Sequence, residues 1–180
     1  MALMAATNTL TRADLDALPA DNLRHELIDG RIVMSPAPGL RHQEAAGALY
    51  RLLWSATRGT ELMALSAPFD VVLGPNVVEP DVLVARRAIF TDRDLPVAPL
   101  LVVEVLSPGT SGMDTGRKRN LYAEAGVAHY WLIDPAEPSV TILTLADGRY
   151  IEVDRAVGDV AIGVEEPVGL RFSAAGLLED

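Results

Sequence analysis

The stretch Leu100–Tyr122, LLVVEVLSPGTSGMDTGRKRNLY, decides the expected architecture of this chain. Its first part, residues 100–107, is an apolar run that predicts a strand covered on both faces in the middle of a sheet. Glu104 interrupts this run. The segment 113–126 then predicts a helix, which contains Lys118, the only lysine among the 15 lysine and arginine residues. A carboxylate inside a buried strand therefore has a single lysine just beyond it in sequence.

Hydrophobic periodicity and turn residues predict the elements on both sides of this stretch. In chain order we expect a short helix at 11–18, a hairpin at 24–35, a helix at 39–59, strands at 61–73, 76–87, 129–135, 139–145 and 149–154, and one or two short strands after residue 160. The pairs Asp29-Gly30 and Asp147-Gly148 are favoured in tight hairpin turns. This order predicts an α/β (α+β) fold with a mixed central β-sheet flanked by helices, an extra N-terminal hairpin and C-terminal strands.

Length and composition indicate one domain. At 180 residues the chain fits a single domain, which we assign to residues 21–180 behind an N-terminal extension at 1–20. A hydrophobic content of 49% and a charged content of 22% are ordinary for a globular protein. The absence of cysteine excludes a disulfide framework and a thiolate metal site. Without a signal-peptide pattern or an apolar run of ~18 residues, we expect a cytoplasmic protein that does not enter a membrane.

The net charge of −10 bounds how the chain could contact nucleic acid. It excludes a protein that coats nucleic acid with its whole surface, because phosphate contacts require basic side chains. The segment 116–119, GRKR, is the only dense basic stretch. We therefore expect any nucleic-acid contact to be local, with Arg117 and Arg119 as candidate substrate-binding arginines.

Asp81, Glu104 and Lys118 stand out because two are acids within apolar strands and the third follows shortly after. Burying an unpaired carboxylate is costly, so such groups are normally paired, protonated or bound to a metal. Two carboxylates on adjacent strands repel each other unless a cation lies between them. Mg²⁺ suits two carboxylates, a backbone carbonyl and several waters, and it can lower the pKa of a bound water. A nearby lysine ammonium can orient such a water as a compact point charge.

Each of these residues also has an ordinary structural explanation. Asp81 follows Pro80 and could be solvated at a strand edge, and Glu104 could pair with an arginine. Lys118 could belong to a solvated helix surface, where Asp114 four residues earlier would form an ion pair worth ~0.3 kcal/mol. The three residues together, in this order, are more specific than any one of them alone.

The same segments carry a resemblance to a known family. The sequence resembles the PD-(D/E)XK nuclease superfamily and, more closely, the Uma-two family of proposed restriction endonucleases, also described as a domain of unknown function. The matching segments are HELIDGRIVMSPAP, RHQEAAGAL, VVEPDVLVA, LLVVEVLSPGTSGMDTGRKRNLYAEAGVAHYWLIDP and VTILTL, over roughly residues 24–145. The most specific match is VVEVLSP followed by Asp114, Lys118, Tyr122, Gly126, Val127, Tyr130 and Trp131.

The resemblance implies a restriction-endonuclease-like fold and a metal site. Asp81 and Glu104 would be the metal carboxylates, and the main-chain carbonyl of Val105 would be a further ligand. The usual superfamily pattern has a lysine two residues after the second acid, where this chain has Leu106. In this family the lysine comes from the next helix, which makes Lys118 the candidate. Glu104 would then be tolerated in its strand because a metal binds it.

Further residues fit the family motifs or follow the central strand. Glu26 in HELIDG would be an additional catalytic acid, or else an exposed strand residue before a turn. His42 matches a histidine at the start of the family's helix and would contact substrate or cap that helix. Ser107 would bind phosphate or serve a turn. We expect the neighbouring aromatic residues to be core or interface residues: Tyr122, Tyr130 and Trp131.

The sequence leaves two functional hypotheses. It contains no glycine-rich phosphate loop, no GxSxG motif and no closely spaced histidines for zinc. The resemblance implies a Mg²⁺-dependent endodeoxyribonuclease, with Mn²⁺ as a substitute, that leaves 5′-phosphate and 3′-hydroxyl ends. On duplex DNA a homodimer would cut both strands with one site each. The alternative is a catalytically silent interaction or regulatory module with a nuclease fold, which the acidic net charge favours.

Overall fold

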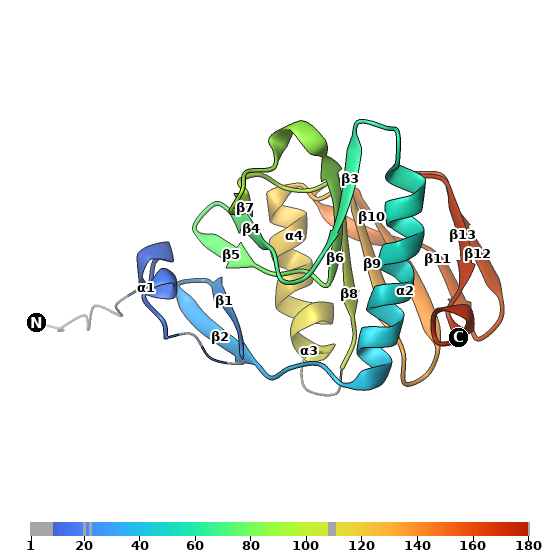
Figure 1. Cartoon of the computed structure of the whole chain (residues 1–180), viewed down its shortest axis with the longest axis horizontal. Helices are drawn as coiled ribbons and strands as arrows, with labels where there is room; N and C mark the ends of the chain where they lie inside the picture. The colour runs from blue at the N-terminus through green and yellow to red at the C-terminus, as the bar shows by residue number, and fades with distance from the viewer. Residues whose placement is uncertain (1–8, 20, 22, 108–110, 180) are drawn as a thin grey trace, which may run out of the picture.

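The computed structural model describes residues 9–19, 21, 23–107 and 111–179. Its elements, in chain order, are α1 (Arg12–Asp16), β1 (Arg24–Ile28), β2 (Arg31–Ser35), α2 (Leu40–Thr57), β3 (Leu62–Ser66), β4 (Asp70–Leu73), β5 (Asn76–Val78), β6 (Val82–Arg86), η1 (Arg87–Ile89), β7 (Asp94–Leu95), β8 (Leu101–Val105), α3 (Ser111–Met113), η2 (Asp114–Lys118), α4 (Arg119–Ala125), β9 (His129–Asp134), β10 (Ser139–Ala146), β11 (Arg149–Val157), β12 (Ala161–Val164), β13 (Leu170–Ser173) and η3 (Ala175–Leu177). This order confirms the predicted α/β class, and Figure 1 shows the arrangement.

Three sheets carry the strands. The central sheet has the order β11-β10-β9-β8-β6-β3. It is mixed, as predicted, because β8 pairs parallel with β9 and antiparallel with β6. A five-stranded sheet of order β2-β1-β5-β4-β7 contains the expected N-terminal hairpin, and β12 and β13 form the expected C-terminal strands. The predicted β8 strand therefore lies within the central sheet.

The helices α2 and α4 cover opposite faces of the central sheet (Figure 1). Side chains alternate between the two faces along a strand. Val84 of β6 accordingly belongs to the buried cluster that contains Leu49 of α2, whereas its neighbour Leu83 belongs to the cluster that contains Leu121 of α4. All positions of β8 are buried, which confirms a strand covered on both faces.

The prediction of two continuous strands at 61–73 and 76–87 is wrong, because each segment contributes to two sheets. β3 pairs with β6 in the central sheet, whereas β4 pairs with β5 in the five-stranded sheet. The chain changes sheet near Pro68 and again near Pro80, since proline has no N–H to continue a strand ladder. Asp81 lies at the second change of sheet, directly before β6, and not inside a strand.

The helix predicted at 113–126 contains an unpredicted π-helical turn, η2, between α3 and α4. Such turns are rare and are often found at functional sites. The helix ends as predicted at Gly126, whose φ of 83° is in the left-handed region that favours glycine. Both predicted hairpin turns are confirmed, since Asp29-Gly30 and Asp147-Gly148 take positive φ angles.

The N-terminal helix α1 packs against the five-stranded sheet. Its Leu15 lies in a small buried cluster with Leu27 of β1 and Val77 of β5. Within the segment assigned to an N-terminal extension, residues 1–8 and 20 lie outside the described residues.

None of the helices in the described part of the chain is both long enough and apolar enough to cross a membrane.

Candidate active site

The strand register brings Asp81 and Glu104 together. β6 and β8 are antiparallel, and Val82 lies opposite Val103. Continuing this register by one residue places Asp81 opposite Glu104. Both carboxylates are buried, with exposed fractions of 4% for Asp81 and 1% for Glu104. The fold thus places two acids from different segments side by side, away from bulk water.

Glu104 lies on the α4 face of the sheet, where its Oε1 accepts two hydrogen bonds. The Tyr122 hydroxyl donates at 2.7 Å and the Lys118 ammonium at 3.1 Å. Burial raises the pKa of Glu104 to about 8; the charge of Lys118 opposes this rise and the charge of Asp81 adds to it. Burial therefore favours the protonated form of Glu104, and an approaching cation would favour the ionised form.

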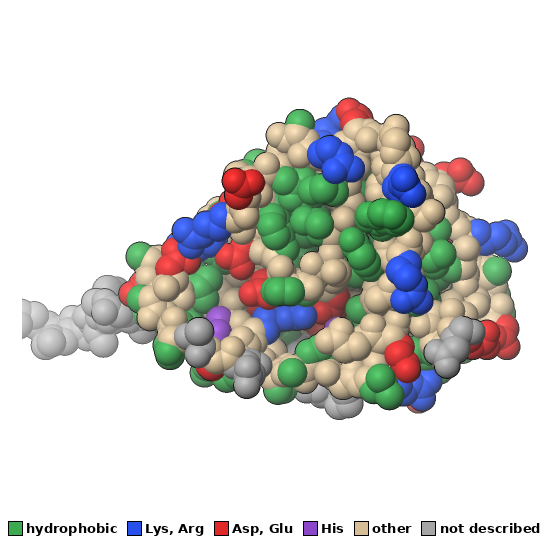
Figure 2. Space-filling model, viewed as in Figure 1, with side chains coloured by type: hydrophobic (Ala, Val, Ile, Leu, Met, Phe, Trp, Pro, Cys, Tyr) green, Lys and Arg blue, Asp and Glu red, His purple; other side chains and the backbone are tan. Residues whose placement is uncertain are grey.

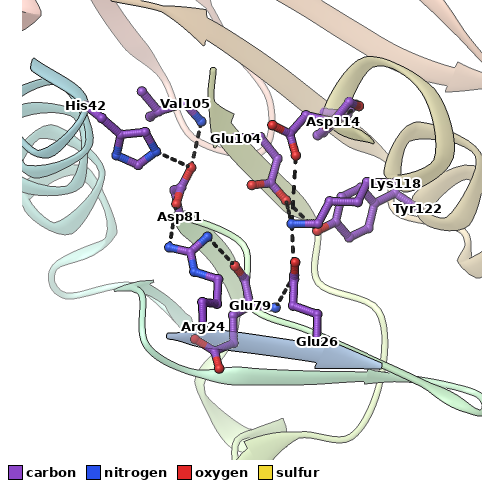
Figure 3. A network of polar contacts seen from close by, with 11 residues as sticks. Arg24, Glu26, His42, Glu79, Asp81, Glu104, Val105, Asp114, Lys118 and Tyr122 are labelled. Atoms are coloured by element: carbon purple, nitrogen blue, oxygen red, sulfur yellow. Dashed lines mark hydrogen bonds and ion pairs between the residues drawn. The ribbon is translucent and has the colours of Figure 1, made fainter. Parts of the chain in front are cut away.

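Lys118 is the centre of the acidic cluster (Figure 3). It lies at the end of the π-helical turn with only 3% of its surface exposed, which excludes a solvated helix surface. Its Nζ lies 2.8 Å from Glu26 Oε1, 3.1 Å from Glu104 Oε1 and 3.9 Å from Asp114 Oδ1. Burial alone would lower the pKa of Lys118, but these carboxylates outweigh it and raise the pKa. The ammonium therefore stays charged.

Asp81 is held by three donors. Its Oδ1 accepts a hydrogen bond of 2.8 Å from Arg24 Nη2. Its Oδ2 accepts the Val105 backbone N–H at 2.8 Å and lies 3.2 Å from His42 Nε2. Burial alone would raise the pKa of Asp81, but the His42 bond, the Arg24 charge and the Val105 N–H lower it to about 2. The pKa of Asp81 is thus lowered and that of Glu104 raised, a division typical of crowded carboxylates.

Strand β1 supplies two further charged groups, because alternate residues of a strand share one face. Glu26 is 3% exposed, contacts Lys118 and accepts the Glu79 backbone N–H at 2.9 Å. Arg24, besides its bond to Asp81, donates to the Glu79 carbonyl at 3.2 Å. The five-stranded sheet therefore closes one side of the cluster (Figure 3).

Two adjoining cavities border this network. A cavity of about 260 Å³ is lined by Glu104, Lys118 and Ser107, among others. A second, of about 370 Å³, extends from the network to Gln43 and Ser66. The residues that line both are Arg24, Pro36, Ala37, Pro38, His42 and Asp81. In the lower half of the face in Figure 2, acidic, basic and histidine side chains lie close together.

The structure brings most of the predicted site residues into this network or onto its cavities, but two remain apart. Arg117 forms an ion pair with Asp29 at the surface, and Arg119 donates to the Tyr150 carbonyl at 3.0 Å. Neither arginine lines the two cavities. A contact of Arg117 or Arg119 with substrate would therefore have to occur outside them.

Sequence reasoning missed the role of Arg24. It was one of many scattered arginines, and its spacing of two residues from Glu26 was the only local signal. Tyr122 is fully buried, as expected of a core aromatic, but its hydroxyl also fixes Glu104. The Val105 backbone N–H donates to Asp81, a contact that the sequence did not predict. The sequence predicted a role for the Val105 carbonyl instead, as a metal ligand.

A hard divalent cation fits the donor set of Asp81 and Glu104. Both supply oxygen ligands on one cavity, and a divalent cation would offset the burial and the Asp81 charge that together raise the pKa of Glu104. In Figure 3 the second oxygen of Glu104 points to the Asp81 side. Within residues 9–19, 21, 23–107 and 111–179, no group of three or more His, Asp or Glu side chains could hold a metal ion. The remaining ligands would be waters and substrate phosphate, as is common for Mg²⁺.

Comparisons with known proteins give a family and a similar fold. The model of a family named Uma2 and described as "Putative restriction endonuclease" matches residues 12–175. The fold is similar to the crystal structure of "a putative nuclease belonging to DUF820" from Anabaena variabilis, with a TM-score of 0.73 over 94% of this chain and 97% of that chain. The two sequences are 21% identical, so this likeness establishes the predicted fold alone. No curated protein matches the sequence.

Proposed function

Because this chain belongs to the Uma2 family, we propose that it is an endonuclease that hydrolyses DNA phosphodiester bonds and requires a divalent cation, Mg²⁺ or Mn²⁺. The observation that carries the proposal is the buried contact between the only lysine, Lys118, and Glu104, on the same cavity as Asp81. Two acids and a fixed ammonium around one cavity suit phosphodiester hydrolysis, in which negative charge builds up on phosphoryl oxygens.

Asp81 and Glu104 would hold the cation, which when bound polarises a phosphoryl oxygen and lowers the pKa of a bound water. The two acids make unequal contributions before binding. Asp81 is ionised at every pH above its pKa of about 2, whereas Glu104, with a pKa of about 8, must release a proton to become a ligand. Tyr122 keeps Glu104 Oε1 in place by its 2.7 Å hydrogen bond and acts as a positioning residue.

Lys118 would supply the remaining positive charge. Its ammonium is anchored by Glu26 at 2.8 Å and lines the 260 Å³ cavity. A charge that is fixed before the reaction costs no reorganisation when charge develops on the phosphate. Lys118 would therefore donate hydrogen bonds to the attacking water or to a phosphoryl oxygen. On duplex DNA, two copies of the chain would present one site to each strand.

A second candidate function, an interaction module without turnover, is favoured by the completeness of the network. Asp81 already accepts hydrogen bonds from Arg24 and Val105 and contacts His42, so the chain itself satisfies this carboxylate. The net charge is −10, and apart from the cluster the basic side chains on the face in Figure 2 are scattered. Weak non-specific DNA affinity follows from such a surface.

Cleavage of supercoiled plasmid DNA distinguishes these functions. The wild type would be compared with Lys118→Met, with Glu104→Gln and with the control Arg171→Gln, each in Mg²⁺, Mn²⁺ or excess chelator. Arg171 is exposed on β13, and its replacement removes one positive charge, as Lys118→Met does. We expect cation-dependent cleavage by the wild type and the control, and a loss of at least about a hundredfold in both site variants. Equal cleavage by all four proteins, or cleavage in chelator, would contradict the proposal. No cleavage by folded wild type across varied DNA substrates would favour the module.

A further inference from the structure

Arg24 contacts the one carboxylate oxygen of Asp81 that Val105 and His42 do not contact. The Val105 N–H and His42 already share Asp81 Oδ2, whereas Oδ1 is bound by Arg24 at 2.8 Å. A positive guanidinium at this distance repels an approaching divalent cation, and the repulsion is strong in a poorly solvated site. In the DNA-free protein, Arg24 and a cation therefore compete for the same carboxylate oxygen.

The position of Arg24 allows this competition to be resolved by substrate. Its side chain is 20% exposed and lines both cavities beside Asp81, so the guanidinium borders the space that substrate would enter. Its second contact, to the Glu79 carbonyl at 3.2 Å, is to an uncharged group. A guanidinium carries more N–H groups than these two contacts use.

A DNA phosphate would be a strong alternative partner for this guanidinium. Arginine binds phosphate through paired hydrogen bonds, and the long side chain can turn without moving the backbone of β1. Once Arg24 donates to a phosphate in the adjoining cavity, Asp81 Oδ1 is free for a cation. The phosphate in turn brings negative charge that favours cation binding.

We propose that Arg24 blocks Asp81 until DNA arrives and then moves to a DNA phosphate, so that cation and DNA bind together. This inference rests on the proposed function. It makes Arg24 a substrate-binding residue and couples the two ligands, because each removes the obstacle to the other. A purely structural Arg24–Asp81 pair would have the opposite consequence, since removing the arginine would then weaken every property of the site.

The test is Mn²⁺ binding to DNA-free protein, measured by electron paramagnetic resonance, together with plasmid cleavage. The variants are Arg24→Gln, which removes the charge, Arg24→Lys, which keeps it, and Arg171→Gln as the charge-matched control. We expect Arg24→Gln to bind Mn²⁺ at least about tenfold more tightly than the wild type. We expect its cleavage rate to fall at least about a hundredfold, because the phosphate contact is lost. Arg24→Lys should keep wild-type Mn²⁺ affinity and cleave more slowly, and Arg171→Gln should match the wild type in both measurements.

Tighter Mn²⁺ binding with slower cleavage in Arg24→Gln supports the proposal, because a structural role cannot move the two readouts in opposite directions. An Arg24→Gln protein that is unfolded by circular dichroism, or that binds Mn²⁺ no more tightly than the wild type, overturns it. If Arg24→Gln gives either of these results while the wild type binds Mn²⁺ and cleaves DNA, the inference about Arg24 is wrong and the proposed function stands. If the wild type neither binds Mn²⁺ nor cleaves, the proposed function falls and this inference falls with it.

Discussion

Replacing Glu104 by Gln should stabilise the metal-free protein at alkaline pH. The Glu104 carboxyl is 1% exposed and faces Lys118, Tyr122 and the Asp81 carboxylate. Burial, with the charge of Asp81 adding to it and Lys118 opposing, raises its pKa from 4.5 to about 8. The folded protein therefore binds one more proton than the unfolded chain between these two values, and its stability falls as the pH rises through that window. Gln has the same shape and never ionises.

The magnitude follows from the same shift. Since one pKa unit corresponds to about 1.4 kcal/mol, the ionised carboxylate costs the folded state at most about 5 kcal/mol above pH 8. An amide oxygen can still accept the Tyr122 and Lys118 hydrogen bonds. The attraction of Lys118 for an ionised Glu104 is already part of the shifted pKa, and relaxation of the site around the charge makes the worked value an upper bound. We therefore expect a net gain of about 2 kcal/mol at pH 9 and no gain near pH 5, where Glu104 is protonated in the wild type.

Urea unfolding of the wild type and Glu104→Gln in chelator, at pH 5, 7 and 9, measures this effect. The difference in the free energy of unfolding should grow from pH 5 to 9. Mg²⁺ added in sufficient excess to compete with Arg24 for Asp81 should stabilise the wild type and leave Glu104→Gln unchanged, since only the wild type has both carboxylates. A difference that does not vary with pH, or a variant less stable than the wild type at pH 9, would refute the account of crowded carboxylates.

Three further predictions concern individual contacts. Asp81→Asn should lower the free energy of unfolding by about 2 kcal/mol at pH 7, because folding lowers the pKa of Asp81 from 3.8 to about 2. The wild type loses this stabilisation as the pH falls through 2, so urea unfolding curves of variant and wild type should converge there. A gap that stays constant with pH would contradict this prediction. Tyr122→Phe should cost about 1 kcal/mol in thermal unfolding, through loss of its 2.7 Å bond to Glu104, and an unchanged melting temperature would argue against that bond. Asn76→Ala should lower the free energy of unfolding by about 2 kcal/mol, because the buried Asn76 side-chain oxygen accepts the Asp29 N–H at 2.8 Å. Plasmid cleavage below the melting temperature should be unchanged. A loss of cleavage would show that Asn76 acts on the site.

Local signals in the sequence predicted the elements around the site well. The Asp-Gly pairs determine two hairpin turns by their tolerance of positive φ, and the apolar run of β8 requires cover on both faces. The division of the strands at 61–73 and 76–87 was not predicted, because both halves of each segment are rich in apolar residues that favour strands. Pro68 and Pro80 were the available signals for the change of sheet.

The candidate site was predictable only in part, because its contacts join distant segments. Asp81 and Glu104 were identified from their apolar surroundings in sequence, Lys118 as the only lysine, and all three from the family resemblance. The Arg24–Asp81 pair joins residues 57 positions apart, and no local pattern encodes such a contact. The π-helical turn that carries Lys118 is also set by packing, since Tyr130 donates to the Asp114 carbonyl at 2.8 Å from a neighbouring strand.

The location of a bound cation tests the central claim most directly. Crystals of the wild type with a duplex oligonucleotide and Mn²⁺ would be measured at a wavelength where manganese scatters anomalously. The account predicts one strong anomalous peak per chain that contacts both Asp81 and Glu104, with Arg24 turned from Asp81 to a phosphate. A peak that contacts neither carboxylate, or no peak while Arg24 remains on Asp81, would contradict it.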